Sequence, residues 1–291
     1  MKLAGSMCAL VTPFRNGVVD AAALEQLIEF QIENGTTGLI PCGTTGESAT
    51  LSHEEHHHVV DLTVKFARKR APVIAGTGSN STSEAISLTQ AARNSGADAA
   101  LLITPYYIKP TQDGLFAHHM KIADAVDIPQ VLYNVPSRTG ISISPETVAR
   151  LATHPNIVAI KEASGSIDYV SQLRNMSEIT ILSGNDNLTL PLMSLGAKGV
   201  ISVLANVAPR LNAGMIAAVE RNDWETARQI HCRTFPLVEA LFCETNPIPV
   251  KAALALMGKI SGEIRLPMTP MSQKNLPRIE RELAILGIIS R

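Results

Sequence analysis

The sequence predicts an α/β protein that folds as a (β/α)8 barrel, or TIM barrel, with a C-terminal helical extension. Short apolar runs recur at near-regular spacing over residues 7–203, and helical patterns alternate with them. Beyond residue 222 only helical patterns remain. Alternation of this kind over about 220 residues is typical of a barrel whose strands each precede one helix.

The predicted strands are continuous apolar runs without a polar alternation. They read as strands buried on both faces, as in a parallel sheet. In order, they occupy residues 7–11, 38–41, 72–75, 99–103, 129–133, 157–160, 180–182 and 199–203.

The predicted barrel helices follow these strands, and several begin with recognisable caps. Ser52 with Glu55 forms a capping box pattern, and Ser144 precedes Pro145 at a helix start. The helices are expected at residues 20–34, 52–70, 83–94, 112–126, 144–152, 166–176, 187–195 and 209–220. A doubly wound open sheet is the alternative, and the lack of a G-x-G-x-x-G turn after the first strand weakens it.

We expect two parts, a catalytic barrel over residues 1–222 and an extension over residues 223–291. The extension should contain helices at 223–241, 250–257 and 272–286, joined by proline-rich connectors, and should pack on the barrel.

Composition excludes several classes of function. The chain has 25 Lys and Arg against 26 Asp and Glu, which argues against nucleic-acid binding and against a basic membrane surface. Aromatic residues make up only 4%, too few to expect stacking on bases. No apolar stretch is long enough to span a membrane. Four cysteines without a C-x-x-C pair, and no signal peptide, favour a reduced cytoplasmic location.

The active site of such a barrel lies where the strands end, so residues that follow the strands are the candidates. Lys161 directly follows the run 157–160. A lysine amine is protonated in water, and an apolar setting favours the neutral nucleophile that forms a Schiff base with a ketone. The alternative is a lysine paired with a carboxylate at the rim.

Other polar residues follow neighbouring strands. Thr44 and Thr45 lie between glycines, in a turn that could hold a carboxylate or phosphate, or could be a plain turn. Arg138 suits bidentate carboxylate binding, or a surface salt bridge. Tyr107 and Tyr133 suit a proton relay, or packing with one hydrogen bond.

One motif points to a different chemistry. His53, Glu54 and His57 match H-E-x-x-H, the zinc protease pattern. The motif lies in the first turn after a cap, and three consecutive histidines cannot share one ligand face, so we expect no metal. No G-x-S-x-G or P-loop pattern is present, which disfavours serine hydrolase and nucleotide-binding functions.

Several ordered motifs resemble the dihydrodipicolinate synthase family, now called 4-hydroxy-tetrahydrodipicolinate synthases. They are GTTGESATL at 43–51, AGTG at 75–78, TPYY at 104–107, YNVPSRTG at 133–140 and KEA at 161–163. The resemblance runs from about residue 5 through NPIPVK at 246–251 to about residue 286.

The resemblance implies a class I aldolase, a lyase that condenses pyruvate with L-aspartate-4-semialdehyde. This is the first committed step of the diaminopimelate route to L-lysine, and it needs no cofactor beyond the imine of pyruvate with Lys161. Tyr133 matches the tyrosine that shuttles protons. Thr44 matches the threonine that links two tyrosine hydroxyls. Tyr107 matches a tyrosine that enters from a neighbouring subunit, in a family that is usually a homotetramer built as a dimer of dimers.

The resemblance also assigns substrate-binding residues. Thr45 matches the cradle for the pyruvate carboxylate, and Arg138 matches the arginine that receives the carboxylate of the semialdehyde. Gly184 and the carbonyl of Ile201 match residues that line the same pocket.

Feedback-inhibited members bind L-lysine at a dimer interface, and this chain carries the matching residue types. The set is Ser48, Ala49, His53, His56, Asn80, Glu84 and Tyr106. Glu84 could pair with the ammonium of the ligand and Tyr106 could bind its carboxylate. The alternative is a polar interface without a ligand.

The sequence departs from the family pattern at Ile108, where asparagine is common, and at Asn185, where aspartate is common. Sister 2-keto-acid lyases such as N-acetylneuraminate lyase share the barrel, the lysine and the tyrosine. Thr44 and Arg138 favour the synthase over these lyases. An inactive binding barrel is a further alternative.

Overall fold

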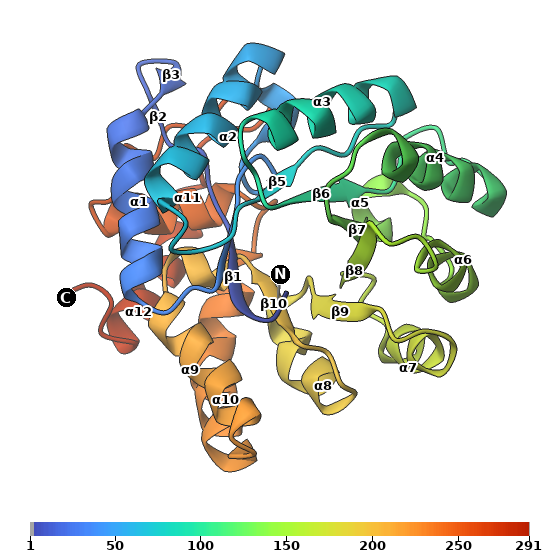
Figure 1. Cartoon of the computed structure of the whole chain (residues 1–291). Helices are drawn as coiled ribbons and strands as arrows, with labels where there is room; N and C mark the ends of the chain where they lie inside the picture. The colour runs from blue at the N-terminus through green and yellow to red at the C-terminus, as the bar shows by residue number, and fades with distance from the viewer. Residues whose placement is uncertain (1–2, 291) are drawn as a thin grey trace.

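The computed structural model describes residues 3–290, and the parallel strands form the predicted barrel within a ring of helices (Figure 1). The strands are β1 (Gly5–Ala9), β4 (Gly38–Ile40), β5 (Ile74–Gly76), β6 (Ala99–Ile103), β7 (Gln130–Asn134), β8 (Ile157–Glu162), β9 (Thr180–Ser183) and β10 (Gly199–Ser202). They are ordered β4-β1-β10-β9-β8-β7-β6-β5, and the paired neighbours are parallel.

Two backbone hydrogen bonds join the ends of this order and bring β4 against β5. Leu39 N donates to Pro72 O at 2.9 Å, and Gly76 N donates to Pro41 O at 2.9 Å. A single parallel bridge between Leu39 and Val73 lies at the same place. The fold predicted from the sequence is therefore confirmed.

Each predicted barrel helix is present. They are α1 (Ala21–Glu33), α2 (His53–Ala67), α3 (Thr82–Asn94), α4 (Gln112–Ala125), α6 (Pro145–Leu151), α7 (Ile167–Met176), α8 (Thr189–Ser194) and α9 (Pro209–Glu220). The capping box at Ser52 and Glu55 is formed, and Ser144 caps α6 ahead of Pro145.

Several short elements were not predicted. They are the hairpin β2 (Phe14–Arg15) and β3 (Val18–Val19), helix α5 (Pro136–Thr139), and the 3-10 turns η1 (Ser48–Thr50), η2 (Asp186–Leu188) and η3 (Leu204–Asn206). Elements of two to four residues span only about one period of a strand or helical pattern, so no repeating pattern marks them.

The extension consists of α10 (Trp224–Leu241), α11 (Ile248–Leu256) and α12 (Leu276–Ile285). In Figure 1, α10 lies beside α9, and α11 and α12 lie near α1. Their apolar side chains form one core with Ala23 and Leu27 of α1 and with the segment after β10. The extension thus packs on the barrel as expected, while a domain boundary at residue 222 stays a prediction.

The barrel interior is aliphatic and comes from the strands themselves. Met7, Ile40, Ile74, Val131 and Ile201 are buried there. Because the outer faces of the strands also pack under helices, no polar alternation is possible, which explains the continuous apolar runs.

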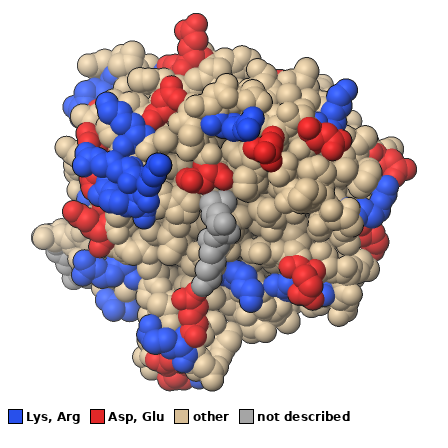
Figure 2. Space-filling model, in the orientation of Figure 1, with Lys and Arg blue, Asp and Glu red and all other residues tan. Residues whose placement is uncertain are grey.

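Charges on the molecular surface are mixed. On the face shown in Figure 2, acidic and basic side chains lie interspersed, and the largest basic group has acidic neighbours. None of the helices between residues 3 and 290 is long and apolar enough to cross a membrane.

Candidate active site

Lys161 lies near the carboxyl end of β8, beside Tyr133 of β7. The two residues are partners in the strand register, and Lys161 Nζ is 4.2 Å from the centroid of the Tyr133 ring. Both side chains are 7% exposed. The amine is therefore held near a phenol at the mouth of an aliphatic barrel, with only a small part of it open to solvent.

Gly184, after β9, leaves room for the lysine. A Cβ at this position would stand 2.6 Å from Ala163 Cβ, closer than real Cβ atoms approach, and 3.1 Å from Lys161 Cε, a tight contact. Ile201, on β10, is buried in the same interior as Tyr133.

The loop after β4 carries the two threonines and is folded into consecutive turns. Gly46 N donates to Gly43 O at 3.0 Å and Glu47 N donates to Thr44 O at 3.1 Å. Glu47 adopts a left-handed φ of 55°. Thr45 is buried, and its Oγ1 accepts a hydrogen bond from Asn246 Nδ2 at 3.0 Å.

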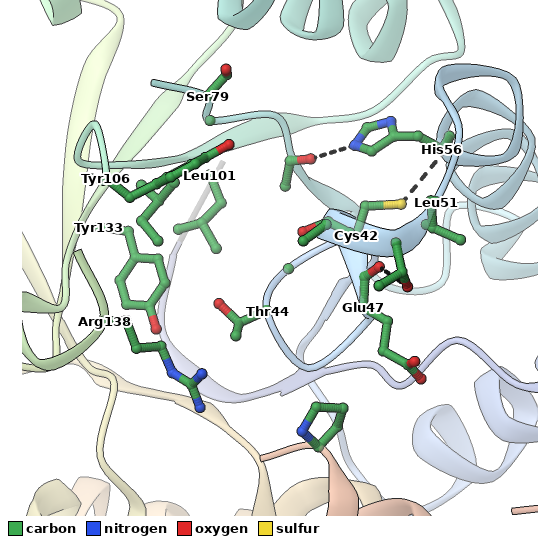
Figure 3. A pocket seen from close by; sticks show the side chains of 18 of the residues that line it. Cys42, Thr44, Glu47, Leu51, His56, Ser79, Leu101, Tyr106, Tyr133 and Arg138 are labelled. Carbon is green, nitrogen blue, oxygen red and sulfur yellow. Dashed lines mark hydrogen bonds between the residues drawn. The ribbon is translucent and has the colours of Figure 1, made fainter. Parts of the chain in front are cut away.

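A cavity of about 630 Å³ lies above these residues and is lined by Thr44, Tyr133 and Arg138, among others. Figure 3 shows the hydroxyls of Thr44 and Tyr133 directed into it, with the Arg138 guanidinium at the same end. Arg138 belongs to α5, and its Nη2 donates to Asn246 O at 3.2 Å.

The relay expected from the sequence is not assembled within this one chain. Tyr107 is 87% exposed with a left-handed φ of 74°, and it does not line the cavity. Among residues 3–290, Thr44 makes no side-chain hydrogen bond to Tyr133 or Tyr107. The exposure of Tyr107 is compatible with a role in another subunit, which stays a prediction.

Six of the residues predicted to bind lysine line the same cavity, on its side toward α2 and α3. They are Ser48, Ala49, His53, His56, Glu84 and Tyr106. Asn80 does not line the cavity, but its side chain donates to Tyr106 O at 3.3 Å. Residues of both predicted sites therefore line one cavity, with Thr44, Tyr133 and Arg138 from the catalytic and substrate-binding set. The other members of that set that belong to the barrel rim are not among its lining residues, namely Lys161, Thr45, Gly184 and Ile201.

Glu84 is the charged centre of this second group. One carboxylate oxygen lies 2.8 Å from His53 Nε2, and the other accepts a hydrogen bond from Ser79 Oγ. These hydrogen bonds, that from Ser79 first, lower the pKa of Glu84, so the carboxylate is ionised at neutral pH. His56 instead bonds Gly76 O at 2.8 Å, and burial lowers its pKa.

The histidines of the H-E-x-x-H pattern do not converge. His53 faces Glu84, whereas His57 Nε2 is buried without a hydrogen-bond partner. Within the described part of the chain, no group of three or more His, Cys, Asp or Glu side chains is arranged to hold a metal ion.

The departures from the family pattern lie beside the site. Ile108 is exposed next to Tyr107. Asn185 forms a turn with Ser183, whose Oγ donates to Asn185 O at 2.8 Å. Neither residue lines the cavity.

Sequence reasoning missed residues that support the site. Asn246 contacts both Thr45 and Arg138. Asp186 is buried and accepts hydrogen bonds from Ser202 Oγ at 2.5 Å and from Val203 N and Leu204 N at 3.0 Å. The positive charge of Lys161 also acts to lower the pKa of Asp186.

Burial nevertheless raises the pKa of Asp186, against the opposing effect of these donors. The same holds for Glu162, beside Lys161 on the strand. Its pKa is raised by burial although Asn134 Nδ2 and Ser164 N donate to it. The available signal for both acids was a polar residue within four positions of the end of a predicted strand.

A buried lysine at the carboxyl end of a (β/α)8 barrel, beside a tyrosine that lines an open cavity, fits the aldolase class of lyases. A sequence model of the dihydrodipicolinate synthetase family matches residues 2–286. The chain belongs to this family, and it is an enzyme, a lyase of the aldolase type.

Relatives cover nearly the whole chain. It is 57% identical to 4-hydroxy-tetrahydrodipicolinate synthase of Geobacter sulfurreducens, over 94% of this chain and 96% of that protein. The chloride-inhibited dihydrodipicolinate synthase from Acinetobacter baumannii, solved with pyruvate, is 47% identical with a TM-score of 0.97, over 99% and 100% of the two chains. The DHDPS from Cyanidioschyzon merolae, solved with lysine bound, is 42% identical with a TM-score of 0.96, over 98% and 99%.

Proposed function

We propose that this lyase is a 4-hydroxy-tetrahydrodipicolinate synthase that condenses pyruvate with L-aspartate-4-semialdehyde through an imine on Lys161. The observation that carries the proposal is the buried Lys161 amine beside the Tyr133 ring, with Gly184 leaving space at its side. The pyruvate complex of the Acinetobacter baumannii enzyme supports pyruvate as the first substrate.

The chemistry proceeds through an electron sink. The Lys161 amine adds to the pyruvate ketone and water leaves, which gives the imine. Loss of a methyl proton then gives an enamine rather than a bare carbanion. The enamine carbon attacks the aldehyde, whose oxygen takes up a proton. Finally, the amine of the bound semialdehyde attacks the imine carbon and displaces Lys161, closing the ring. Tyr133 and Thr44, with Tyr107 from a second subunit, carry the protons.

Two anion-binding groups fix the substrates. Thr45 and its turn hold the carboxylate of pyruvate, close to the barrel mouth. Arg138, at the outer end of the cavity, binds the carboxylate of the semialdehyde. This pair of groups supports the synthase over sister lyases, because the second substrate carries its own carboxylate.

A substrate assay tests this proposal. Purified enzyme should consume pyruvate only when L-aspartate-4-semialdehyde is present, and N-acetylneuraminate should not release pyruvate. Arg138→Met should raise KM for the semialdehyde roughly 10–100-fold, the loss expected for a hydrogen bond to a charged group. Activity on N-acetylneuraminate, or no turnover of either substrate, would favour the sister lyases or an inactive barrel.

We further propose that L-lysine inhibits the enzyme by binding between α2 and α3 of two chains in a homotetramer. The ionised Glu84 would hold the ligand's ammonium, with Tyr106 and His53 beside it. The lysine complex of the Cyanidioschyzon merolae enzyme supports this ligand. The place in lysine biosynthesis, the absence of a further cofactor and a cytoplasmic location belong to the same proposal.

Inhibition can be measured directly. Millimolar L-lysine should slow the wild-type enzyme, and Glu84→Gln should weaken the inhibition at least about tenfold by removing the charge partner. His231→Gln, in α10 and outside the cavity, is the control and should be inhibited like wild type. An enzyme insensitive to lysine would remove the regulatory claim but leave the catalytic one.

A further inference from the structure

Asn246 contacts two residues of the candidate site, Thr45 through a buried hydrogen bond and Arg138 through a partly buried one. It lies in the connector before α11, is only 6% exposed, and is far from both partners in the sequence. Its side-chain Nδ2 donates to Thr45 Oγ1 at 3.0 Å. Its backbone carbonyl accepts from Arg138 Nη2 at 3.2 Å.

The direction of the first hydrogen bond matters. A threonine hydroxyl has one proton to donate and two lone pairs to accept. Asn246 occupies a lone pair of Thr45 and leaves its proton unused. Within residues 3–290, Thr45 Oγ1 has no other hydrogen-bond partner. The hydroxyl proton is thereby left available to another acceptor, as binding of an anion requires.

Helix α11, which follows Asn246, contacts the loop after β4 at a second point. Lys251, in α11, donates from Nζ to the carboxylate of Glu47 and to Thr12 O, and all of these groups are buried. Glu47 ends the loop that begins with Thr44 and Thr45. The loop is therefore tied to the extension at both Thr45 and Glu47, so the orientation of Thr45 is fixed by residues outside the barrel.

We propose that Asn246 is a positioning residue for pyruvate, which acts by orienting the Thr45 hydroxyl toward the pyruvate carboxylate. This inference rests on the proposed function. Because the contact with Arg138 uses the backbone carbonyl, a change of side chain at this position should affect pyruvate far more than the semialdehyde.

A double-mutant cycle tests the proposal. Asn246→Leu keeps the branched shape of the side chain and removes the donor, and it should raise KM for pyruvate about tenfold with little change in kcat or in KM for the semialdehyde. Thr45→Val should have a similar effect. The double variant should be no worse than the more impaired single variant, since both act through one hydroxyl.

Asn212→Leu is a matched control. Asn212 is buried in α9, and its Nδ2 donates to Ser6 Oγ at 2.8 Å near the opposite end of the barrel. This variant should lose stability without any change in KM for pyruvate. A generally loosened barrel would instead change both variants alike.

Asn246→Asp provides a second test should Asn246→Leu not fold. An aspartate would accept a hydrogen bond from the Thr45 hydroxyl, and its negative charge would repel the pyruvate carboxylate. KM for pyruvate should therefore rise more than tenfold at neutral pH. At lower pH, protonation restores a donor and should reduce the defect relative to wild type.

Unchanged KM for pyruvate in either Asn246 variant would overturn the proposal, as would additive effects in the cycle. Borohydride trapping of pyruvate on wild-type enzyme distinguishes failure of the proposed function from failure of the positioning role. If the wild type forms no imine, the proposed function fails. If it forms the imine and the Asn246 variants bind pyruvate normally, only the positioning role fails.

Discussion

At the residue scale, the space around Lys161 depends on the absence of a side chain at Gly184. This position has no left-handed φ, so its glycine is required by close contact and not by backbone conformation. The neighbours a Cβ would meet include Ala163 and the stem of the lysine itself.

Gly184→Ala should therefore impair the site more than the fold. The added methyl group must displace Lys161 Cε or the strand beside it. A displacement of this order can cost about 10²-fold in rate, whereas overpacking costs about 1–3 kcal/mol of stability. kcat/KM for pyruvate and thermal unfolding would be measured together.

Gly214→Ala in α9 is the control, because a Cβ there meets nothing closer than 3.8 Å. It should leave activity unchanged and stabilise the protein slightly, since alanine favours helix. Wild-type activity of Gly184→Ala would contradict the close packing described for Lys161.

At this scale the sequence predicted residues that lie on the barrel rim. Lys161, Tyr133 and Thr44 each lie at the end of an apolar strand or shortly after it, and parallel strands bring such positions together at one edge. Asn246 could not be predicted in this way. It meets Thr45 across 201 positions of sequence, and only the packing of the extension brings the two together.

At the element scale, helix α11 is joined to the loop after β4 by the buried pair of Lys251 and Glu47. Burial lowers the pKa of Lys251, and the Glu47 carboxylate acts in the opposite direction. The pair also meets Arg265, whose backbone N donates to Glu47 Oε2 at 3.2 Å.

Lys251→Met should destabilise the protein by about 3–5 kcal/mol, because it leaves a buried carboxylate without its charge partner. Adding Glu47→Gln should recover much of this loss in urea unfolding. As a control, Arg228→Met breaks an exposed pair with Glu225 and should cost less than about 1 kcal/mol. Equal loss in the single and double variants at the buried pair would contradict this account.

Long helices and strands could be predicted from sequence patterns, whereas very short elements could not. The long apolar runs and capped helices were predicted to within a few residues. Helix α5, which carries Arg138, has only four residues and is set by Pro136 and the turn at Gly140. Pro136 and Gly140 mark its two ends, but four residues are too few for a periodic pattern to predict the helix between them.

At the scale of the whole molecule, stability should depend on pH through histidines buried in α4. Burial lowers the pKa of His118 to about 4 and that of His119 to about 3. Both folded-state values lie below the ordinary value of about 6.5, so between these limits the unfolded chain binds more protons. The contribution of these two histidines to stability is therefore fully present above about pH 6.5 and is lost as the pH falls toward their folded-state pKa values.

Each of these histidines should contribute up to about 1.4 kcal/mol of lost stability per pH unit in that window. Urea unfolding at fixed protein concentration between pH 7 and pH 5 measures the slope, above the range where most carboxylates titrate. His119→Leu should make the slope shallower, whereas His58→Leu, on the surface of α2, should not. An unchanged slope in the His119 variant would contradict the prediction.

The central claim is that Lys161 forms the imine with pyruvate. Enzyme incubated with pyruvate and reduced with borohydride should gain one reduced pyruvate adduct per chain, and peptide mass analysis should locate it on Lys161. Lys161→Met should gain none. An adduct on another lysine, or no adduct on the wild-type enzyme, would contradict the account.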